Sequence, residues 1–98
     1  MIIIAGTARV KPEAREAAVA AATTMQERSA AEPGCQAYGF WFAIDDPHQM
    51  LLFERWDDAA ALEAHLGQPH TAEFGAALGD FVAEPPHLMR YEAEPAEF

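Results

Sequence analysis

The spacing of hydrophobic and polar positions changes several times along the chain, and each change marks an element. Residues 2–10 are rich in β-branched side chains and predict a strand. Residues 11–32 are dominated by alanine, with Pro12 suited to a first helical turn and Glu-Pro-Gly at the end, so they predict a long helix. The side of this helix expected to be buried carries Ala14, Ala18, Ala21, Ala22 and Met25.

Two aromatic and apolar runs follow and predict a hairpin. Residues 35–44 (CQAYGFWFAI) predict one strand and residues 49–56 (QMLLFERW) the returning strand, joined by a turn at 45–48 (DDPH). Because side chains alternate along a strand, the first strand should point Tyr38, Phe40 and Phe42 to one side and Ala37, Gly39 and Trp41 to the other.

The next segment predicts helix in two pieces. Residues 58–66 form the first, which begins at a capping aspartate, Asp57 or Asp58, and ends at Gly67. Pro69 begins the second, where the apolar residues follow the i, i+3, i+4, i+7 spacing of a buried face. These residues are Phe74, Ala77, Leu78 and Phe81.

Residues 87–93 predict a last strand, and 94–98 form an acidic tail. The order β-α-β-β-α-β is that of the ferredoxin-like α+β fold, in which an antiparallel four-stranded sheet is covered by helices on one face only. The chain length predicts one domain, residues 1–93.

The central strands are apolar on both sides, although helices can cover only one of them. An antiparallel sheet with one face in water normally alternates polar and apolar residues, and the runs YGFWF and MLLF do not. The uncovered face should therefore pack on a second copy of the chain, so we expect a homodimer formed through the sheet face.

Composition narrows the possible partners. Sixteen acidic and six basic residues give a net charge of −10, which disfavours binding to nucleic acid or to anionic membranes. The opening MIIIAGTARV lacks the basic region and the long apolar core of a signal peptide, so we expect none, and no run approaches transmembrane length. A single cysteine, Cys35, fits a reducing cytoplasm, where we expect the protein to reside.

Two stretches carry a resemblance to a known family. The segments EPGCQAYGFW and LLFERWDDAAALEAHLGQPHTAEF resemble the antibiotic biosynthesis monooxygenase (ABM) domain family, and the resemblance covers nearly the whole chain. It implies a dimeric α+β barrel. Members of this family include cofactor-independent oxygenases of polyketide anthrones and quinols, haem-degrading enzymes and proteins without an assigned substrate.

Trp56 and His65 are the candidate catalytic residues. Trp56 ends a strand, so it either packs in the core or borders a cavity, where its ring could stack on a flat ligand and its N–H could donate a hydrogen bond. His65 is either a structural histidine or a general base. Glu54 shares the strand face of Trp56 and, if buried, needs a partner, for which Arg9, Arg55 and Arg90 are candidates.

A second set of residues is predicted to bind an aromatic substrate. The spacing of the histidines makes no zinc motif, and no phosphate or dinucleotide loop is present, so we expect neither a metal nor a cofactor. Oxygenation without a cofactor requires an apolar slot, a base, and a substrate that supplies the electrons. The residues predicted to bind the substrate are Tyr38, Phe40, Phe42, Leu52, His70 and Phe74.

Two alternatives remain open. The haem-degrading branch carries a proximal histidine where this chain has Phe74, and an asparagine where it has Gly6 and Thr7, so the chain departs from that branch. The domain could instead be a non-catalytic module that binds an aromatic metabolite. An open cavity lined by His65 and Trp56 would favour chemistry, and a space filled by side chains would favour the module.

Overall fold

The structure is a computed structural model that describes all 98 residues. Its elements are β1 (Ile2–Arg9), η1, a short 3-10 turn (Pro12–Ala14), α1 (Arg15–Ala30), β2 (Cys35–Ala43), β3 (Asp46–Trp56), α2 (Ala59–Leu66), α3 (Pro69–Phe81) and β4 (His87–Glu92). The predicted ferredoxin-like α+β fold is confirmed.

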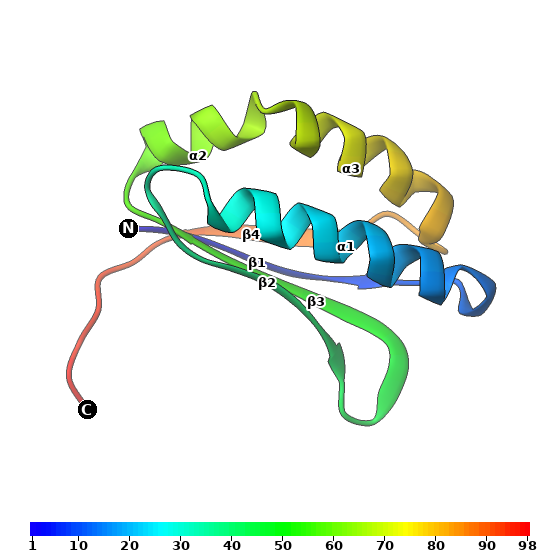
Figure 1. The fold of residues 1–98 in the computed structure, drawn as a ribbon. Helices are drawn as coiled ribbons and strands as arrows, with labels where there is room; N and C mark the ends of the chain where they lie inside the picture. Colours follow the sequence, from blue (N-terminus) through cyan, green and yellow to red (C-terminus); the bar gives the residue numbers. More distant parts are fainter.

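The four strands form one antiparallel sheet in the order β2-β3-β1-β4. All three helices lie over the same face of this sheet, and the opposite face is left uncovered (Figure 1). No helix is long and apolar enough to span a bilayer.

The predicted turn at 45–48 is wrong, because β3 already begins at Asp46 and the turn occupies only residues 44–45. β1 pairs with β3 only as far as Gln49, so the first residues of β3 lie at an edge beyond the end of β1. Proline lacks the N–H that a central strand needs, but an edge position tolerates it. Pro47 can therefore belong to the strand.

The observed helix is shorter than the predicted one at residues 11–32, and its buried side differs in part from the predicted side. Residues 12–14 form the turn η1, and α1 starts only at Arg15. The buried residues are Ala18, Ala22, Met25 and Ser29, whereas Ala14 and Ala21 are only half-buried. The buried stripe therefore ends in a polar residue, Ser29.

The inner face of the sheet holds two separate groups of buried residues. The first, which we call the apolar cluster, consists of Ala8, Val10, Ala18 and Met50. The second, the tryptophan cluster, consists of Ile2, Trp56 and Leu62. The predicted α3 face, Phe74, Ala77, Leu78 and Phe81, is half-buried and turned inward.

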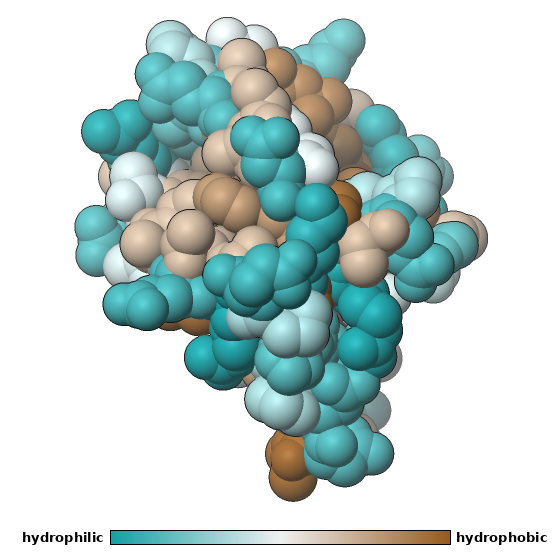
Figure 2. Space-filling model, turned by 90° about the vertical axis from the view of Figure 1, so that its right-hand side faces the viewer, coloured by the Kyte–Doolittle hydropathy of each residue, from teal (hydrophilic) through white to brown (hydrophobic).

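The outer face of the sheet carries large exposed hydrophobic side chains. Trp41 is 54% exposed, and Leu51, Met89 and Tyr91 are also exposed. The β2–β3 hairpin projects from the body (Figure 1), and Ile44 in its turn is fully exposed. The side of the molecule shown in Figure 2 is mostly hydrophilic, with smaller hydrophobic areas between the polar ones.

Candidate functional site

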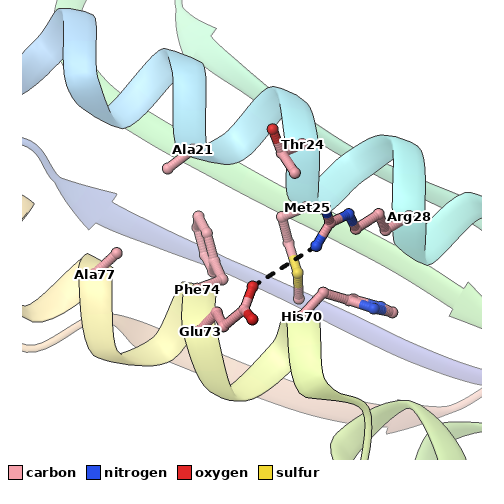
Figure 3. A pocket seen from close by; sticks show the side chains of 8 residues that line it. All are labelled: Ala21, Thr24, Met25, Arg28, His70, Glu73, Phe74 and Ala77. Carbon is pink, nitrogen blue, oxygen red and sulfur yellow. Dashed lines mark ion pairs between the residues drawn. The ribbon is translucent and has the colours of Figure 1, made fainter.

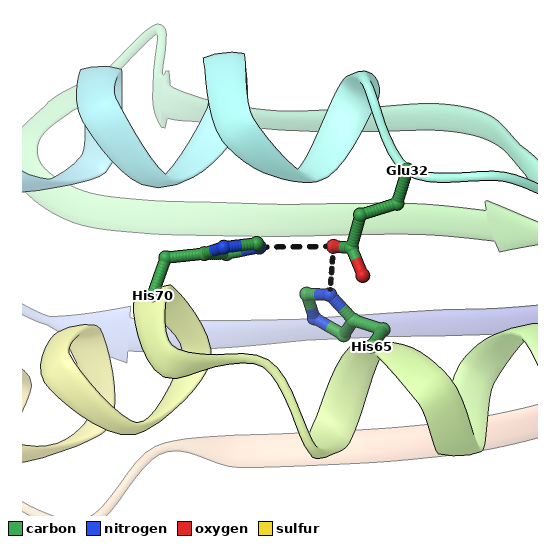
Figure 4. A group of neighbouring side chains, drawn as sticks. All are labelled: Glu32, His65 and His70. Atoms are coloured by element: carbon green, nitrogen blue, oxygen red, sulfur yellow. Dashed lines mark hydrogen bonds and ion pairs between the residues drawn. The ribbon is translucent and has the colours of Figure 1, made fainter.

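Two histidines and one glutamate meet between the helices and the sheet. His65 Nδ1 lies 2.6 Å from Glu32 Oε2, and His70 Nε2 lies 3.0 Å from the same oxygen (Figure 4). Glu32 follows the end of α1, while His65 belongs to α2 and His70 to the first turn of α3. Three segments that are distant in sequence are thus joined at a single carboxylate oxygen.

Local sequence signals place the two histidines. The carboxylate of Asp58 accepts a hydrogen bond from the N–H of Ala61 and thereby caps α2 at its N-terminus, as predicted. Pro69 begins α3 two residues after Gly67, where α2 ends. The Thr71 hydroxyl donates to the backbone carbonyl of His65 at 2.7 Å and so ties the start of α3 to the end of α2.

The burial of Glu32 explains why it has two imidazole partners. Its side chain is 8% exposed, and those of His65 and His70 are 2% and 13% exposed. A buried carboxylate is costly unless donors satisfy it. When Glu32 is ionised its oxygen only accepts hydrogen bonds, and in that state Nδ1 of His65 and Nε2 of His70 carry the protons in these two contacts.

Trp56 is fully buried, and its polar edge is already occupied. Its Nε1–H donates to Glu54 Oε1 at 2.9 Å, and its ring lies 4.6 Å from the His65 ring, centroid to centroid. The indole N–H is therefore not free to hold a ligand in this conformation.

The predicted arginine partner of Glu54 is wrong. Arg9 pairs with Asp46, and Arg55 donates to Gln36, while the partner of Glu54 is Trp56. Burial raises the pKa of Glu54, and the Trp56 hydrogen bond and the nearby His65 partly oppose that shift. His65 Nε2 lies 3.8 Å from Glu54 Oε1, so the two acidic residues flank His65 on its two nitrogens.

Tyr38 packs against the same group and stays protonated. Its ring lies 5.4 Å from that of His65, and burial together with the charge of Glu54 raises the pKa of its hydroxyl. Ser29, whose hydroxyl lies close to that of Tyr38, is fully buried and makes no hydrogen bond of normal geometry. Burial also raises the pKa of the Cys35 thiol, which favours its neutral form over the reactive thiolate.

A groove between α1 and α3 lies next to this site. It has a volume of about 230 Å³, and two predicted substrate-binding residues, His70 and Phe74, line it (Figure 3). The other lining residues are Ala21, Thr24, Met25, Arg28, Glu73 and Ala77. His70 therefore touches both the groove and the buried Glu32.

The other predicted substrate-binding residues do not line this groove, although the Phe40 ring lies 5.3 Å from that of Phe74 and 5.7 Å from that of Tyr38. Phe40 and Leu52 line a small enclosed hollow of about 40 Å³ beneath the helices. Phe42 lies under the guanidinium of Arg15, which sits 4.2 Å from the centre of its ring. Trp56, His65 and Tyr38 line none of these hollows. The structure thus does not bring the predicted set together around one cavity.

Sequence reasoning missed Glu32, the residue at the centre of the site. It treats Glu32 only as part of the Glu-Pro-Gly segment that ends a helix. The available signal is its place in the Glu-x-Gly-Cys motif of the resemblance, but nothing nearby in the sequence indicates its partners, which lie 33 and 38 residues away.

Comparison with known proteins agrees with the fold. Residues 1–77 match the sequence model of a family described as "Antibiotic biosynthesis monooxygenase". An uncharacterised protein of Synechocystis is 35% identical over 93% of this chain, which spans only 62% of that relative. "Putative monooxygenase Rv0793" of Mycobacterium tuberculosis is 33% identical over 76% of the chain and 73% of the relative. "Putative monooxygenase YcnE" of Bacillus subtilis is 28% identical over 94% and 97%.

Solved structures resemble the chain over nearly its full length. A protein from Deinococcus radiodurans, described as a "putative antibiotic biosynthesis monooxygenase", superposes with a TM-score of 0.92 at 25% identity, covering 100% of this chain and 97% of that one. The structure of Rv0793 gives a TM-score of 0.89 at 26% identity, covering 97% and 96%.

Proposed function

Because the chain belongs to the antibiotic biosynthesis monooxygenase family, we propose that it oxygenates a small electron-rich aromatic molecule of the quinol or anthrone type without a bound cofactor. The observation that carries this proposal is the contact of both His65 and His70 with Glu32, next to a groove that His70 lines. The substrate class rests on the chemistry of oxygenation without a cofactor.

The substrate must supply the electrons. An anthrone loses a proton from its ring system and becomes an electron-rich anion, which can pass an electron to dioxygen. In the net reaction the substrate loses two hydrogens and gains one oxygen atom, and the second oxygen atom leaves as water. The protein then needs only to accept the proton, exclude water and hold the developing negative charge.

His70 is the proton acceptor best placed for a molecule in the groove. Since its Nε2–H donates to Glu32, its Nδ1 is the nitrogen that can accept a proton. Glu32 would stabilise the resulting imidazolium, and His65 holds Glu32 from the buried side. His65 itself remains a predicted base, but at 2% exposure it could meet a substrate only after the interior opens.

The groove suits a small, flat ligand. Phe74 and Met25 supply apolar walls, and the volume of about 230 Å³ lies below the range of roughly 300–1,000 Å³ typical of pockets for drug-sized ligands. One or a few fused rings therefore fit the proposal better than a large polyketide.

Oxygen uptake with an anthrone or a hydroquinone tests this function. We expect uptake by the wild type, one atom of ¹⁸O from labelled dioxygen in the product, and a loss of about 10²–10⁴-fold in kcat/KM for His70→Ala. His48 in the β2–β3 hairpin provides the control, because it does not line the groove and His48→Ala should retain the wild-type rate. An unchanged rate in His70→Ala contradicts the proposed proton acceptor, and an unchanged rate in His65→Ala removes His65 from the mechanism.

We also propose that the protein is a homodimer formed through the outer face of the sheet. Trp41, Leu51, Met89 and Tyr91 expose apolar surface there, which a second copy would cover. Light scattering should give twice the chain mass of 10.7 kDa, and Trp41→Asp should shift the protein toward the monomer. A stable wild-type monomer at micromolar concentration would contradict the dimer.

The closed packing around Trp56 and His65 favours one alternative function. A dimeric module that binds an aromatic molecule without converting it needs no reactive group open to a cavity, and neither of these residues lines the groove between α1 and α3 or the small hollow at Phe40 and Leu52. Saturable binding of the hydroquinone with no oxygen uptake would select this module over the enzyme.

A further inference from the structure

We propose that Glu32, His65 and His70 form a binding site for a divalent transition-metal ion of the zinc type. Each residue offers one donor atom, and the three atoms lie within 4.8 Å of one another. They come from three separate segments whose side chains converge on one point (Figure 4). Two imidazoles and one carboxylate are a donor set that zinc uses in sites that keep a fourth position open.

The three donor atoms must change their separations to hold such an ion. Bonds of about 2.1 Å to a tetrahedral zinc put the donors about 3.4 Å apart. The oxygen of Glu32 now lies 3.0 Å from His70 Nε2 and 2.6 Å from His65 Nδ1, both of which are hydrogen-bond distances. A rotation of the long glutamate side chain can lengthen these two distances, and the imidazole nitrogens, which lie within 4.8 Å of each other, must move closer together.

The residues around the site support the ligand role of His65. A histidine that binds a metal through one nitrogen commonly donates its other N–H to a carboxylate, which fixes the ring. If an ion occupies Nδ1 of His65, the proton moves to Nε2, and this N–H can donate to Glu54 Oε1 once the present distance of 3.8 Å shortens to that of a hydrogen bond. Thr71 anchors the backbone carbonyl of His65, so the ring is fixed at the backbone as well.

Access and charge also fit a cation. His70 lines the groove between α1 and α3, which gives an ion a path from solvent to the site. The net charge of −10 draws cations to the surface. Arg28, the basic residue of the groove, lies 3.6 Å from Glu73, so its charge is balanced there.

This inference goes beyond the proposed oxygenation. An ion on His65 Nδ1 and His70 Nε2 would replace the two protons that these nitrogens share with Glu32. Metal binding and the proton transfer proposed above are therefore alternative states of the same three residues, and metal binding is measured without any turnover.

Calorimetric titration of the untagged, chelator-treated protein with Zn²⁺ tests the site. We expect one ion per chain for the wild type. His70→Ala should bind at least about 10-fold more weakly, because even the loss of a residue that only orients a ligand costs about 10–100-fold. Glu32→Gln preserves the side-chain shape and should show the same loss. The control is the double variant His48→Ala/His87→Ala, which removes the other two of the four histidines and should bind like the wild type.

A second measurement keeps the result independent of folding defects. Zn²⁺ should raise the midpoint of thermal unfolding of the wild type and of the double variant, but not that of Glu32→Gln. The proposal is overturned if the wild type does not bind Zn²⁺, if His70→Ala and Glu32→Gln bind it as the wild type does, or if binding is lost in the double variant.

Discussion

The two buried clusters on the inner face of the sheet are built on different principles. The apolar cluster consists of Ala8, Val10, Ala18 and Met50, and its half-buried neighbours are also hydrophobic. The tryptophan cluster lies beside three buried polar residues, namely Ser29, Glu54 and His65. Packing alone accounts for the first cluster, but burial of an acidic group and an imidazole costs free energy unless every partner is in place.

The difference indicates which region serves a purpose other than folding. Replacing buried ionic groups by apolar residues of similar size often leaves stability unchanged or raises it. A sequence that keeps Glu32, Glu54 and His65 together at one end of the inner face therefore departs from what stability favours, and such departures mark functional regions. Substitutions in and around the two clusters can test this contrast.

The largest effect should come from Trp56→Ala. Loss of a fully buried tryptophan costs about 3–5 kcal/mol in the free energy of unfolding. The substitution also removes the donor to Glu54, so it should cost more than Met50→Ala in the apolar cluster. Urea unfolding at equal protein concentration measures both. Equal losses would show that the Trp56–Glu54 hydrogen bond contributes nothing.

The next largest loss of stability should come from Gly34→Ala, for which Gly75→Ala is a control that should instead stabilise the protein. Gly34 has a φ of 82°, which costs a residue with a side chain about 1–2 kcal/mol, and an added Cβ would lie 2.6 Å from that of Ala61 in α2. The change therefore strains the junction beside Glu32 and should destabilise by at least that amount.

Gly75 lies in α3, where an added Cβ meets no atom within 4 Å. Gly75→Ala should therefore stabilise the protein by about 0.5–1 kcal/mol, the usual gain within a helix. Thermal unfolding of both variants gives the comparison. A destabilised Gly75→Ala, or a neutral Gly34→Ala, would show that the backbone at these positions differs from the one described.

Thr71→Val should cost about 1 kcal/mol, because it removes the part-buried hydrogen bond to the carbonyl of His65. Thr23→Val is a matched control: its hydroxyl donates to the carbonyl of Val19 at the same 2.7 Å, but in an exposed position. Exposed substitutions usually change stability by less than about 0.5 kcal/mol. If both variants lose the same free energy, the contact at His65 has no special structural role.

The sequence predicted much of the contrast between the clusters. Alternation placed Tyr38, Phe40 and Phe42 on a common side of their strand, and Glu54 with Trp56 on one face of theirs, and in the structure both sets face inward. The cap at Asp58 followed from local chemistry. These features depend on neighbours one to four residues apart, which a single sequence shows directly.

The site was harder to predict because its contacts are distant in sequence. Glu32 meets His65 and His70 only after α1, α2 and the sheet have packed, and no periodic pattern records that meeting. The arginine partner expected for Glu54 was wrong for a related reason: charge suggested a distant cation, while geometry supplied the indole two residues along the strand. The hairpin turn was misplaced because Asp and Pro favour turns, but an edge strand tolerates them.

The smallest predicted effect concerns the ion pair beyond the apolar cluster. Hydrogen bonds from the Arg9 guanidinium and from the His48 N–H hold the pKa of Asp46 below its ordinary value of 3.8. A carboxyl with a lowered pKa in the folded state stabilises fully above the unfolded value and loses this contribution as the pH falls through the folded value. Asp46 is partly exposed, so water screens the pair and the contribution is small. Asp46→Asn should therefore be slightly less stable than the wild type at pH 7, and the difference should vanish well below pH 3.8. A difference that persists at low pH would show that the substitution disturbs the hairpin rather than the ion pair.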